Sequence, residues 1–225
     1  PGNKQGKALT MVPQSDVAYQ QEGFDYGITL PEKKDVVEKF KVATVKGSQF
    51  KQPYLEFSGA CAGCGETPYA KLVTQLFGDR MYIANATGCS SIWGHSSPST
   101  PYTYDKNGRG PAWDNSLFED NAEFGYGMFL GQNYIRERAK GNVEKLIAEN
   151  ACADATAAAQ EWIDTYNSGI LNGDATDKLI AALEKMADNE TAKAILAEKD
   201  FLVKKSNWIF GGDGWAYDIG YGGLD

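Results

Sequence analysis

Cysteine and histidine are scarce in this sequence: its 225 residues include four cysteines and a single histidine, His95. Two of the cysteines, Cys61 and Cys64, have CxxC spacing. Few cysteines at this spacing are typical of metal or redox groups in a reducing compartment rather than of a disulfide framework. We therefore expect a cytoplasmic protein.

Positive charge and long apolar stretches are also lacking. Lysine and arginine number 22 against 30 aspartates and glutamates, which gives a formal net charge of −8. Non-specific nucleic-acid binding depends on cations that neutralise phosphates, so this balance argues against it. No apolar run is long enough to span a bilayer and no signal-like segment opens the chain. The sequence therefore predicts neither a nucleic-acid partner nor a membrane span.

The remaining composition is sufficient for one sizeable core. Hydrophobic residues make up 42% of the chain and aromatic residues 12%, as in soluble globular proteins of this length. Residues 1–50 are polar, and their scattered apolar side chains follow no sustained period. We expect them to form an irregular connecting arm, whereas regular structure begins near residue 57.

A glycine-containing loop over residues 59–65 precedes a predicted helix. Thr67 is the predicted N-cap, with Pro68 at the first helical position, and Gly78 is the predicted end. The apolar positions at helical spacing are Tyr69, Leu72, Val73 and Leu76. Residues 81–84 then read as a short buried strand, and residues 85–91 form the loop at its carboxyl end. Ligand sites of open α/β sheets lie at such loops.

The second half of the chain is predicted to contain a loop, a helix, a helical insertion and a strand. Residues 94–116 predict a long loop and residues 117–140 a helix with an acidic start. Residues 141–200 are rich in alanine and predict a helical insertion of two or three helices, interrupted at Gly173 and Asp174. Residues 207–210 read as a buried strand that leads into Gly211, Gly212, Asp213 and Gly214. A strand, a glycine-rich turn and a helix together favour phosphate binding.

The cysteines form the first candidate site. Cys61 and Cys64 share one loop, and Cys89 lies on a second loop, so three thiolates are available without a fourth. Cys152 lies in the alanine-rich helical stretch, and His95 in a loop rich in serine and proline. The pattern fits an iron–sulfur cluster best, although a zinc site, a redox pair and inert core cysteines stay open.

Asp213 forms the second candidate site. A carboxylate in a glycine-rich turn after a strand can hold Mg²⁺ and bridge it to a diphosphate. The same residue is also common as an ordinary turn aspartate.

Four segments of the chain together resemble a known family. They are residues 58–69 (SGACAGCGETPY), 85–94 (NATGCSSIWG), 110–120 (GPAWDNSLFED) and 208–225 (WIFGGDGWAYDIGYGGLD). In this order they resemble pyruvate:ferredoxin oxidoreductase, or pyruvate synthase, specifically its carboxy-terminal thiamine-diphosphate domain. The resemblance covers residues 45–140 and 201–225, and residues 1–44 fit more loosely.

The resemblance implies a thiamine-diphosphate-binding α/β fold, a parallel sheet flanked by helices, which is incomplete in this chain. Residues 1–50 would be an arm that follows upstream domains, and residues 51–225 the N-terminal part of the thiamine domain, with residues 141–200 as a helical insertion. In family members the fourth cluster cysteine and the remaining Mg²⁺ ligands lie past Asp225. We therefore expect the chain alone to be inactive.

The resemblance also implies roles for individual residues. Cys61, Cys64 and Cys89 would be ligands of a [4Fe–4S] cluster. Glu66, a candidate catalytic residue, would lie against the thiamine diphosphate together with Thr87, Gly88 and Cys89. The diphosphate would be cradled by Gly212, Asp213, Gly214 and Trp215, with Asp213 on Mg²⁺.

The implied activity is oxidative decarboxylation of pyruvate with coenzyme A to acetyl-CoA and CO₂. Electrons would pass from the thiamine through the cluster to ferredoxin or flavodoxin, with further clusters elsewhere in a homodimeric enzyme. Another 2-oxo acid is compatible with the same residues. The alternatives are a non-catalytic iron–sulfur or zinc-binding electron-transfer module completed by a partner chain, and a purely structural segment.

Overall fold

The computed structural model describes residues 10–95, 100–186 and 188–216. Within them the chain forms an α/β structure around a three-stranded sheet with the strand order β2-β1-β3. The strands are β1 (Met81–Ala86), β2 (Ala112–Ser116) and β3 (Ser206–Phe210). Both pairs are parallel, which confirms the predicted α/β class and the parallel sheet.

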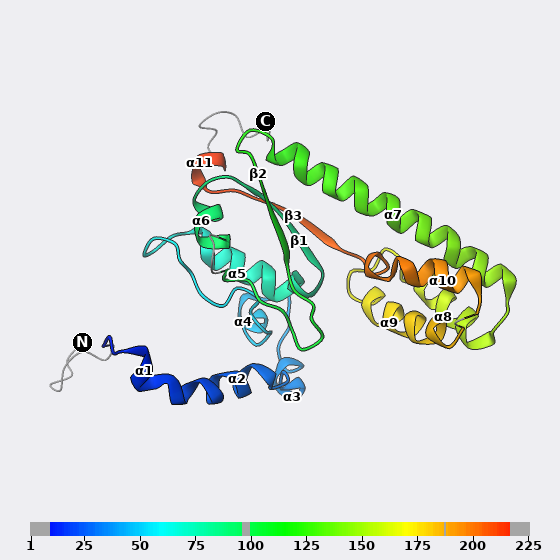
Figure 1. The fold of residues 1–225 in the computed structure, drawn as a ribbon, viewed down its shortest axis with the longest axis horizontal. Coiled ribbons are helices and arrows are strands. Elements are labelled where there is room, and N and C mark those ends of the chain that lie inside the picture. Colours follow the sequence, from blue (N-terminus) through cyan, green and yellow to red (C-terminus); the bar gives the residue numbers. More distant parts are fainter. Residues whose placement is uncertain (1–9, 96–99, 187, 217–225) are drawn as a thin grey trace.

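The helices lie around this sheet, in the first fifty residues and in the helical insertion (Figure 1). In chain order they are α1 (Gln14–Val17), η1 (Ala18–Gln20), α2 (Gln21–Thr29), α3 (Lys34–Val37), α4 (Val45–Ser48), α5 (Glu66–Phe77), η2 (Gly78–Arg80), α6 (Cys89–His95), α7 (Asn121–Glu149), α8 (Ala153–Asp164), α9 (Asn172–Leu183), η3 (Glu184–Met186), α10 (Glu190–Ala197), η4 (Lys199–Phe201) and α11 (Asp213–Ala216). None of the helices in the described ranges is both long and apolar enough to cross a membrane.

β1 is the central strand and the most buried one. Met81 and Ile83 are 1% and 0% exposed, and Ile83 pairs with Trp113 of β2 and with Trp208 of β3. A strand that is buried on both faces is apolar throughout rather than alternating. The strand predicted over residues 81–84 is therefore confirmed, and it continues to Ala86.

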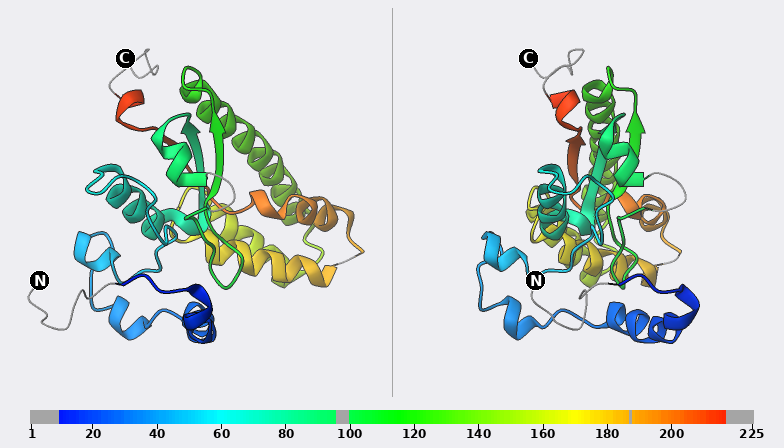
Figure 2. Two further views of the ribbon diagram at one scale, coloured as in Figure 1. Left: turned by 60° about the vertical axis from the view of Figure 1, so that its left-hand side comes forward. Right: turned by 90° about the vertical axis from the view of Figure 1, so that its left-hand side faces the viewer.

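Helices α5 and α7 cover opposite faces of the sheet. Phe77, the last residue of α5, packs on Trp208 with ring centroids 5.3 Å apart. The next residue of β3, Ile209, faces Gly125 of α7. Successive side chains of a strand point to opposite faces, so the two contacts place the two helices on opposite sides. Figure 2 shows the sheet between them.

The long helix α7 joins the sheet to the helical insertion. Its first half lies on β1 and β3, and its second half buries Ala139, Val143 and Leu146 among α8, α9 and α10. The insertion has its own core, in which Trp162, Leu179, Leu183 and Ile195 are fully buried, and Met186 packs against it. The predicted helical spacing of Leu179, Leu183 and Met186 is thus confirmed.

Arg136 of α7 is the buried cation of the insertion. Its guanidinium donates hydrogen bonds to the carbonyl oxygens of Leu202 and Tyr166 and to Oδ1 of Asn172. It also lies 3.8 Å above the ring centroid of Tyr166. A buried charge is tolerated where its donors are satisfied in this way. These contacts join α7, α9 and the segment that leads into β3.

The first fifty residues contain helices where the sequence predicted irregular structure. In the described part of this segment the chain forms α1 to α4, and most of its large apolar side chains are exposed, including Met11, Tyr19, Phe24 and Tyr26. The helices are short, and α2 places few apolar side chains on one side, so the pattern had no sustained period to reveal them.

Four further local predictions are corrected by the structure. Helix α5 begins at Glu66 with Gly65 as its N-cap, so Thr67 is not the cap, although the helix does end at Gly78 as predicted. Tyr69 is 73% exposed, and the most buried side of α5 carries Ala70, Thr74 and Gln75. Residues 112–116 form β2 within the predicted loop. Gly173 and Asp174 lie inside α9 rather than between helices.

Candidate cofactor-binding site

Three loops that carry the predicted site residues meet at the carboxyl edge of the sheet. β1 leads through Thr87 and Gly88 to Cys89, and β3 leads through Gly212 to Asp213. A Cβ atom built on Gly212 would lie 3.9 Å from Cβ of Cys89 and 4.0 Å from Oε2 of Glu66. The structure therefore brings together the cysteine loop after β1, the glycine-rich loop after β3 and the first residue of α5, which are separated widely in the sequence.

The CxxC loop is a tight turn directly before α5. The backbone N–H of Cys64 donates to the carbonyl oxygen of Cys61 at 3.0 Å. Gly63 has a φ of 77°, a conformation that side chains other than glycine rarely adopt. All four cysteines are free, with Cys61 and Cys89 exposed and Cys64 half-buried. The side chains of Cys61 and Cys89 are thus accessible to a group that binds from solvent.

No three His, Cys, Asp or Glu side chains lie close enough to hold one metal ion in the part of the chain that the structure describes. Cys61, Cys64, Cys89 and Asp213 therefore do not form a complete single-ion site by themselves. An iron–sulfur cluster makes a different demand, since each of its four ligands usually binds its own iron.

A network of polar side chains holds the loop that carries Cys89. Asn115 of β2 accepts hydrogen bonds at Oδ1 from Nδ2 of Asn85 at 2.9 Å and from Oγ of Ser91 at 2.8 Å. Its own Nδ2 donates to Oγ1 of Thr87 at 2.9 Å. Ser91 in turn accepts from the backbone N–H of Gly88 at 3.0 Å. The network fixes both sides of the turn that precedes Cys89.

Sequence reasoning assigned Asn115 no role, because it placed the residue in a loop. The signal was present in the segment GPAWDNSLFED, which contains this asparagine. Once β2 is recognised as parallel to β1, its carboxyl end falls beside the loop after β1.

Glu66 is the titratable group at the centre of the site. Burial raises the pKa of this carboxyl above its ordinary value, and the nearby carboxylate of Asp213 raises the pKa further. The indole of Trp93 opposes this rise, although its N–H finds no acceptor with hydrogen-bond geometry among the described residues. The environment thus favours the protonated form of Glu66.

Several buried polar atoms of α6 and of the loop before β2 have no hydrogen-bond partner in the described ranges. They are Oγ of Ser90, Nε1 of Trp93 and the hydroxyl of Tyr102. Burial, followed by the charge of Glu66, raises the pKa of Tyr102, so this hydroxyl keeps its proton. A buried polar group without a partner is costly. These atoms fit a polar group bound among the three loops, and sequence reasoning had not singled out Ser90 or Tyr102.

The glycine-rich turn after β3 is packed against Trp215. A Cβ on Gly211 would lie 2.4 Å from Cε3 of Trp215, so no larger residue fits at this position. Trp215 is 6% exposed, so its side chain is mostly used in packing against this turn, while Asp213 is exposed at the start of α11. Residues 217–225, the rest of the fourth predicted segment, lie outside the described residues.

His95 and Cys152, which carried no predicted chemistry, lie apart from the three loops. His95 is the last residue of α6 and packs on Trp113 with ring centroids 5.1 Å apart. Cys152 is the N-cap of α8 in the helical insertion.

Comparisons with known proteins show what the chain is similar to. No protein-family model matches the chain. The chain is 54% identical over 226 residues to the pyruvate:ferredoxin oxidoreductase of Moorella thermoacetica, which covers 97% of this chain and 19% of that protein. It is 50% identical over 224 residues to the pyruvate-flavodoxin oxidoreductase of Klebsiella pneumoniae, covering 98% and 19%. It is also 46% identical over 244 residues to the pyruvate dehydrogenase (NADP+) of Cryptosporidium parvum, covering 92% and 12%.

The chain therefore spans about one fifth of the length of the first two of these relatives. Along nearly all of its own length, it is homologous to part of the pyruvate:ferredoxin and pyruvate-flavodoxin oxidoreductases.

Proposed function

We propose that this chain is the part of a pyruvate:ferredoxin or pyruvate-flavodoxin oxidoreductase that holds thiamine diphosphate, Mg²⁺ and one [4Fe–4S] cluster. The observation that carries the proposal is the convergence at Gly212, which lies beside both Cys89 and Glu66. The identity to relatives with these activities, 54% and 50%, supports the same assignment.

The residues at the carboxyl edge fit the proposed cofactors by their chemistry. Cys61, Cys64 and Cys89 would supply thiolates to the cluster, and Asp213 a carboxylate oxygen to Mg²⁺. Gly212 and Gly214 carry no side chains of their own, which would allow a diphosphate to approach their backbone. When bound, thiamine diphosphate supplies an electron sink for decarboxylation and the cluster accepts electrons singly.

The role of this chain would be to position the cofactors and to hold a proton near them. Asn115 and Ser91 keep the turn before Cys89 in place through their hydrogen bonds. The raised pKa of Glu66 keeps a proton on its carboxyl to a higher pH than an exposed glutamate would. A protonated carboxyl can donate a hydrogen bond, which makes Glu66 our candidate catalytic residue.

Other segments of the enzyme would complete the site and the reaction. The fourth cluster cysteine, further Mg²⁺ ligands, the coenzyme A site and the additional clusters would come from them. Residues 1–50 would form the arm that connects to upstream domains, residues 51–225 the first part of the thiamine domain, and residues 141–200 its helical insertion. The full enzyme would act as a homodimer on pyruvate and pass electrons to ferredoxin or flavodoxin.

Metal, sulfide and thiamine analysis of the full-length polypeptide, purified without oxygen, tests this proposal. Cys89→Ser should lower iron and acid-labile sulfide by the content of one cluster. Cys152→Ser is the matched control and should leave both unchanged. Asp213→Asn should lower bound thiamine diphosphate and leave iron and sulfide largely in place. Zinc in place of iron with no sulfide would instead indicate a structural or non-catalytic metal module.

A further inference from the structure

A second polar cavity lies at the opposite edge of the sheet from the three loops. Its volume is about 580 Å³, and it lies between the amino ends of the strands and the helical insertion. Its lining includes Tyr82 of β1, Arg109 before β2, Lys205 before β3, and Asp177 of α9. Sites for metabolite-sized ligands commonly have volumes of roughly 300–1,000 Å³. The six residues of β1 separate this cavity from the cysteine loop by about 15–20 Å along the strand.

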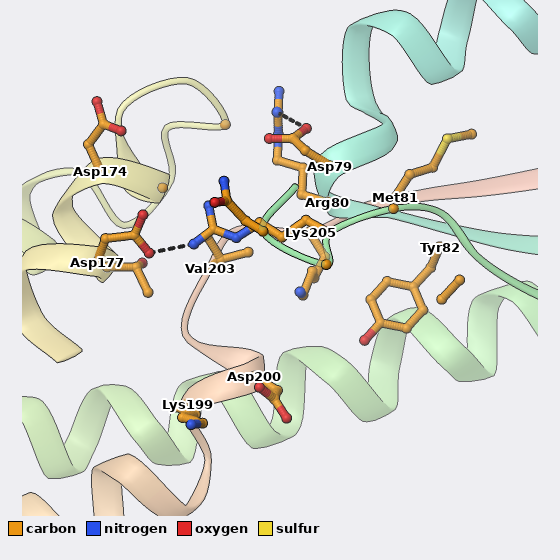
Figure 3. Close-up of a pocket in the computed structure, with 18 of the residues that line it drawn as sticks. Asp79, Arg80, Met81, Tyr82, Asp174, Asp177, Lys199, Asp200, Val203 and Lys205 are labelled. Atoms are coloured by element: carbon orange, nitrogen blue, oxygen red, sulfur yellow. Dashed lines mark hydrogen bonds and ion pairs between the residues drawn. The ribbon is translucent and has the colours of Figure 1, made fainter. Parts of the chain in front are cut away.

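Two ion pairs already neutralise four of the charged side chains that line the cavity. Arg80 pairs with Asp79 at 2.7 Å, and Arg109 pairs with Asp177 at 2.5 Å. Figure 3 shows both pairs as dashed lines on the wall of the cavity. These four residues therefore build the wall and leave other groups available for a ligand.

Lys205 and Lys199 are the cations of this lining that form no ion pair with any described residue, and Lys205 is the one that lies beside Tyr82. Its ammonium has no ion pair or hydrogen bond with any of the described residues, and it lies 5.7 Å from the centroid of the Tyr82 ring. Burial lowers the pKa of Lys205. The carboxylates of Asp200 and Asp79 oppose this shift. An unpaired and partly buried ammonium is costly unless an anion accompanies it.

Tyr82 and Asp200 supply further unused groups beside Lys205. The hydroxyl of Tyr82 donates no hydrogen bond to another described residue, and burial and the charge of Asp200 raise its pKa. Asp200 of η4 likewise forms no ion pair in the described ranges and influences both Tyr82 and Lys205. Figure 3 shows Lys205, Tyr82 and Asp200 around the same open space. Lys205 and Tyr82 thus offer donors and Asp200 an acceptor in one cavity, whose lining also holds Lys199 and Asp174, unpaired among the residues that the structure describes.

We propose that this cavity binds a small organic anion that also carries hydroxyl or amino hydrogens. The anionic group of the ligand accepts hydrogen bonds from the Lys205 ammonium and the Tyr82 hydroxyl, and a hydroxyl or amino group of the ligand donates to Asp200. Phosphate monoesters and hydroxy carboxylates share this chemistry. The site is independent of the proposed function, because it uses none of the residues at the carboxyl edge.

Calorimetric titration of the full-length polypeptide with three probes tests the proposal. The probes are adenosine monophosphate, glycerate and inorganic phosphate, at millimolar concentration. We expect at least one of the two organic probes to bind, and inorganic phosphate to bind more weakly because it has no hydroxyl for Asp200. Binding of adenosine monophosphate would indicate a phosphate monoester as the ligand, and binding of glycerate would indicate a hydroxy carboxylate.

Lys205→Gln should weaken binding of that probe by about tenfold or more, since a hydrogen bond to a charged group is lost. Tyr82→Phe should weaken it several-fold and tests the proposal independently, should the lysine variant fail to fold. Lys204→Gln removes the same charge from a neighbour outside this lining and should leave affinity unchanged. The proposal is overturned if neither organic probe binds, or if Lys205→Gln and Tyr82→Phe bind it as the unmodified protein does.

Discussion

The contact between α7 and β3 gives a sharp prediction for Gly125→Ala. Gly125 is buried, and a Cβ on it would lie 2.6 Å from Cγ1 and 3.0 Å from Cδ1 of Ile209, and 3.2 Å from Cβ of Ala84. Relief requires the Ile209 side chain to leave its rotamer, and α7 to shift slightly from Ala84, whose Cβ is fixed to the strand backbone. Overpacking of this kind costs about 1–3 kcal/mol in the free energy of unfolding.

The Gly125→Ala substitution also has a stabilising effect, because alanine favours the helix more than glycine does. The same substitution at a second glycine of α7 allows this effect to be measured by itself. Replacing glycine by alanine inside a helix stabilises it by about 1 kcal/mol. Gly127 lies two residues further along α7, is exposed, and a Cβ on it would meet nothing within 4 Å. Gly127→Ala should therefore raise the free energy of unfolding. The free energy of unfolding of Gly125→Ala should be about 1–3 kcal/mol lower than that of Gly127→Ala.

Urea unfolding followed by circular dichroism compares the two variants directly. Combining Gly125→Ala with Ile209→Ala should recover part of the loss, because the truncated side chain no longer meets the new Cβ. If Gly125→Ala stabilised the protein as much as Gly127→Ala, the close packing of α7 on β3 would be refuted.

Three further predictions concern single polar side chains. Asn115→Ala should loosen the turn before Cys89 and speed hydrogen exchange of the Gly88 amide several-fold, because Ser91, which accepts from that amide, loses its contact with Asn115; the exposed Asn167→Ala is the control, and equal rates would contradict the role of the network. Glu66→Gln should gain stability relative to the unmodified protein as pH rises from 4 to 7. A carboxyl whose pKa is raised by folding stabilises the folded state while it is protonated, so the unmodified protein loses stability as Glu66 ionises. Urea midpoints of the two proteins that run parallel across this pH range would contradict the prediction. Arg136→Met should lower the free energy of unfolding by about 2–4 kcal/mol, since the carbonyl oxygens of Leu202 and Tyr166 lose their donor, whereas Oδ1 of Asn172 still accepts from the backbone N–H of Lys204. A loss under about 1 kcal/mol in urea unfolding would show that these acceptors are satisfied otherwise.

Much of the local structure could be predicted because it depends on neighbouring residues. The apolar run at residues 81–84 and the spacing of Leu179 and Leu183 depend on periods of a few residues, and both agree with the structure. β2 escaped prediction because residues 112–116 are largely exposed at the sheet edge and show no apolar alternation. The cap of α5 was misplaced because Thr67 and Pro68 are typical of helix starts, yet Gly65 precedes the first turn.

The sequence by itself determined which loops carry thiols, glycines and carboxylates, since these depend on residue identity and local spacing alone. Only the tertiary structure decided that Gly212 lies beside Cys89 and Glu66. It also decided that Asn85 and Asn115, 30 positions apart, share a hydrogen bond behind that loop, and that Lys205 lies beside Tyr82 in a cavity. Such contacts follow from parallel strand pairing and from burial. They join residues far apart in the chain and therefore leave no local pattern in the sequence.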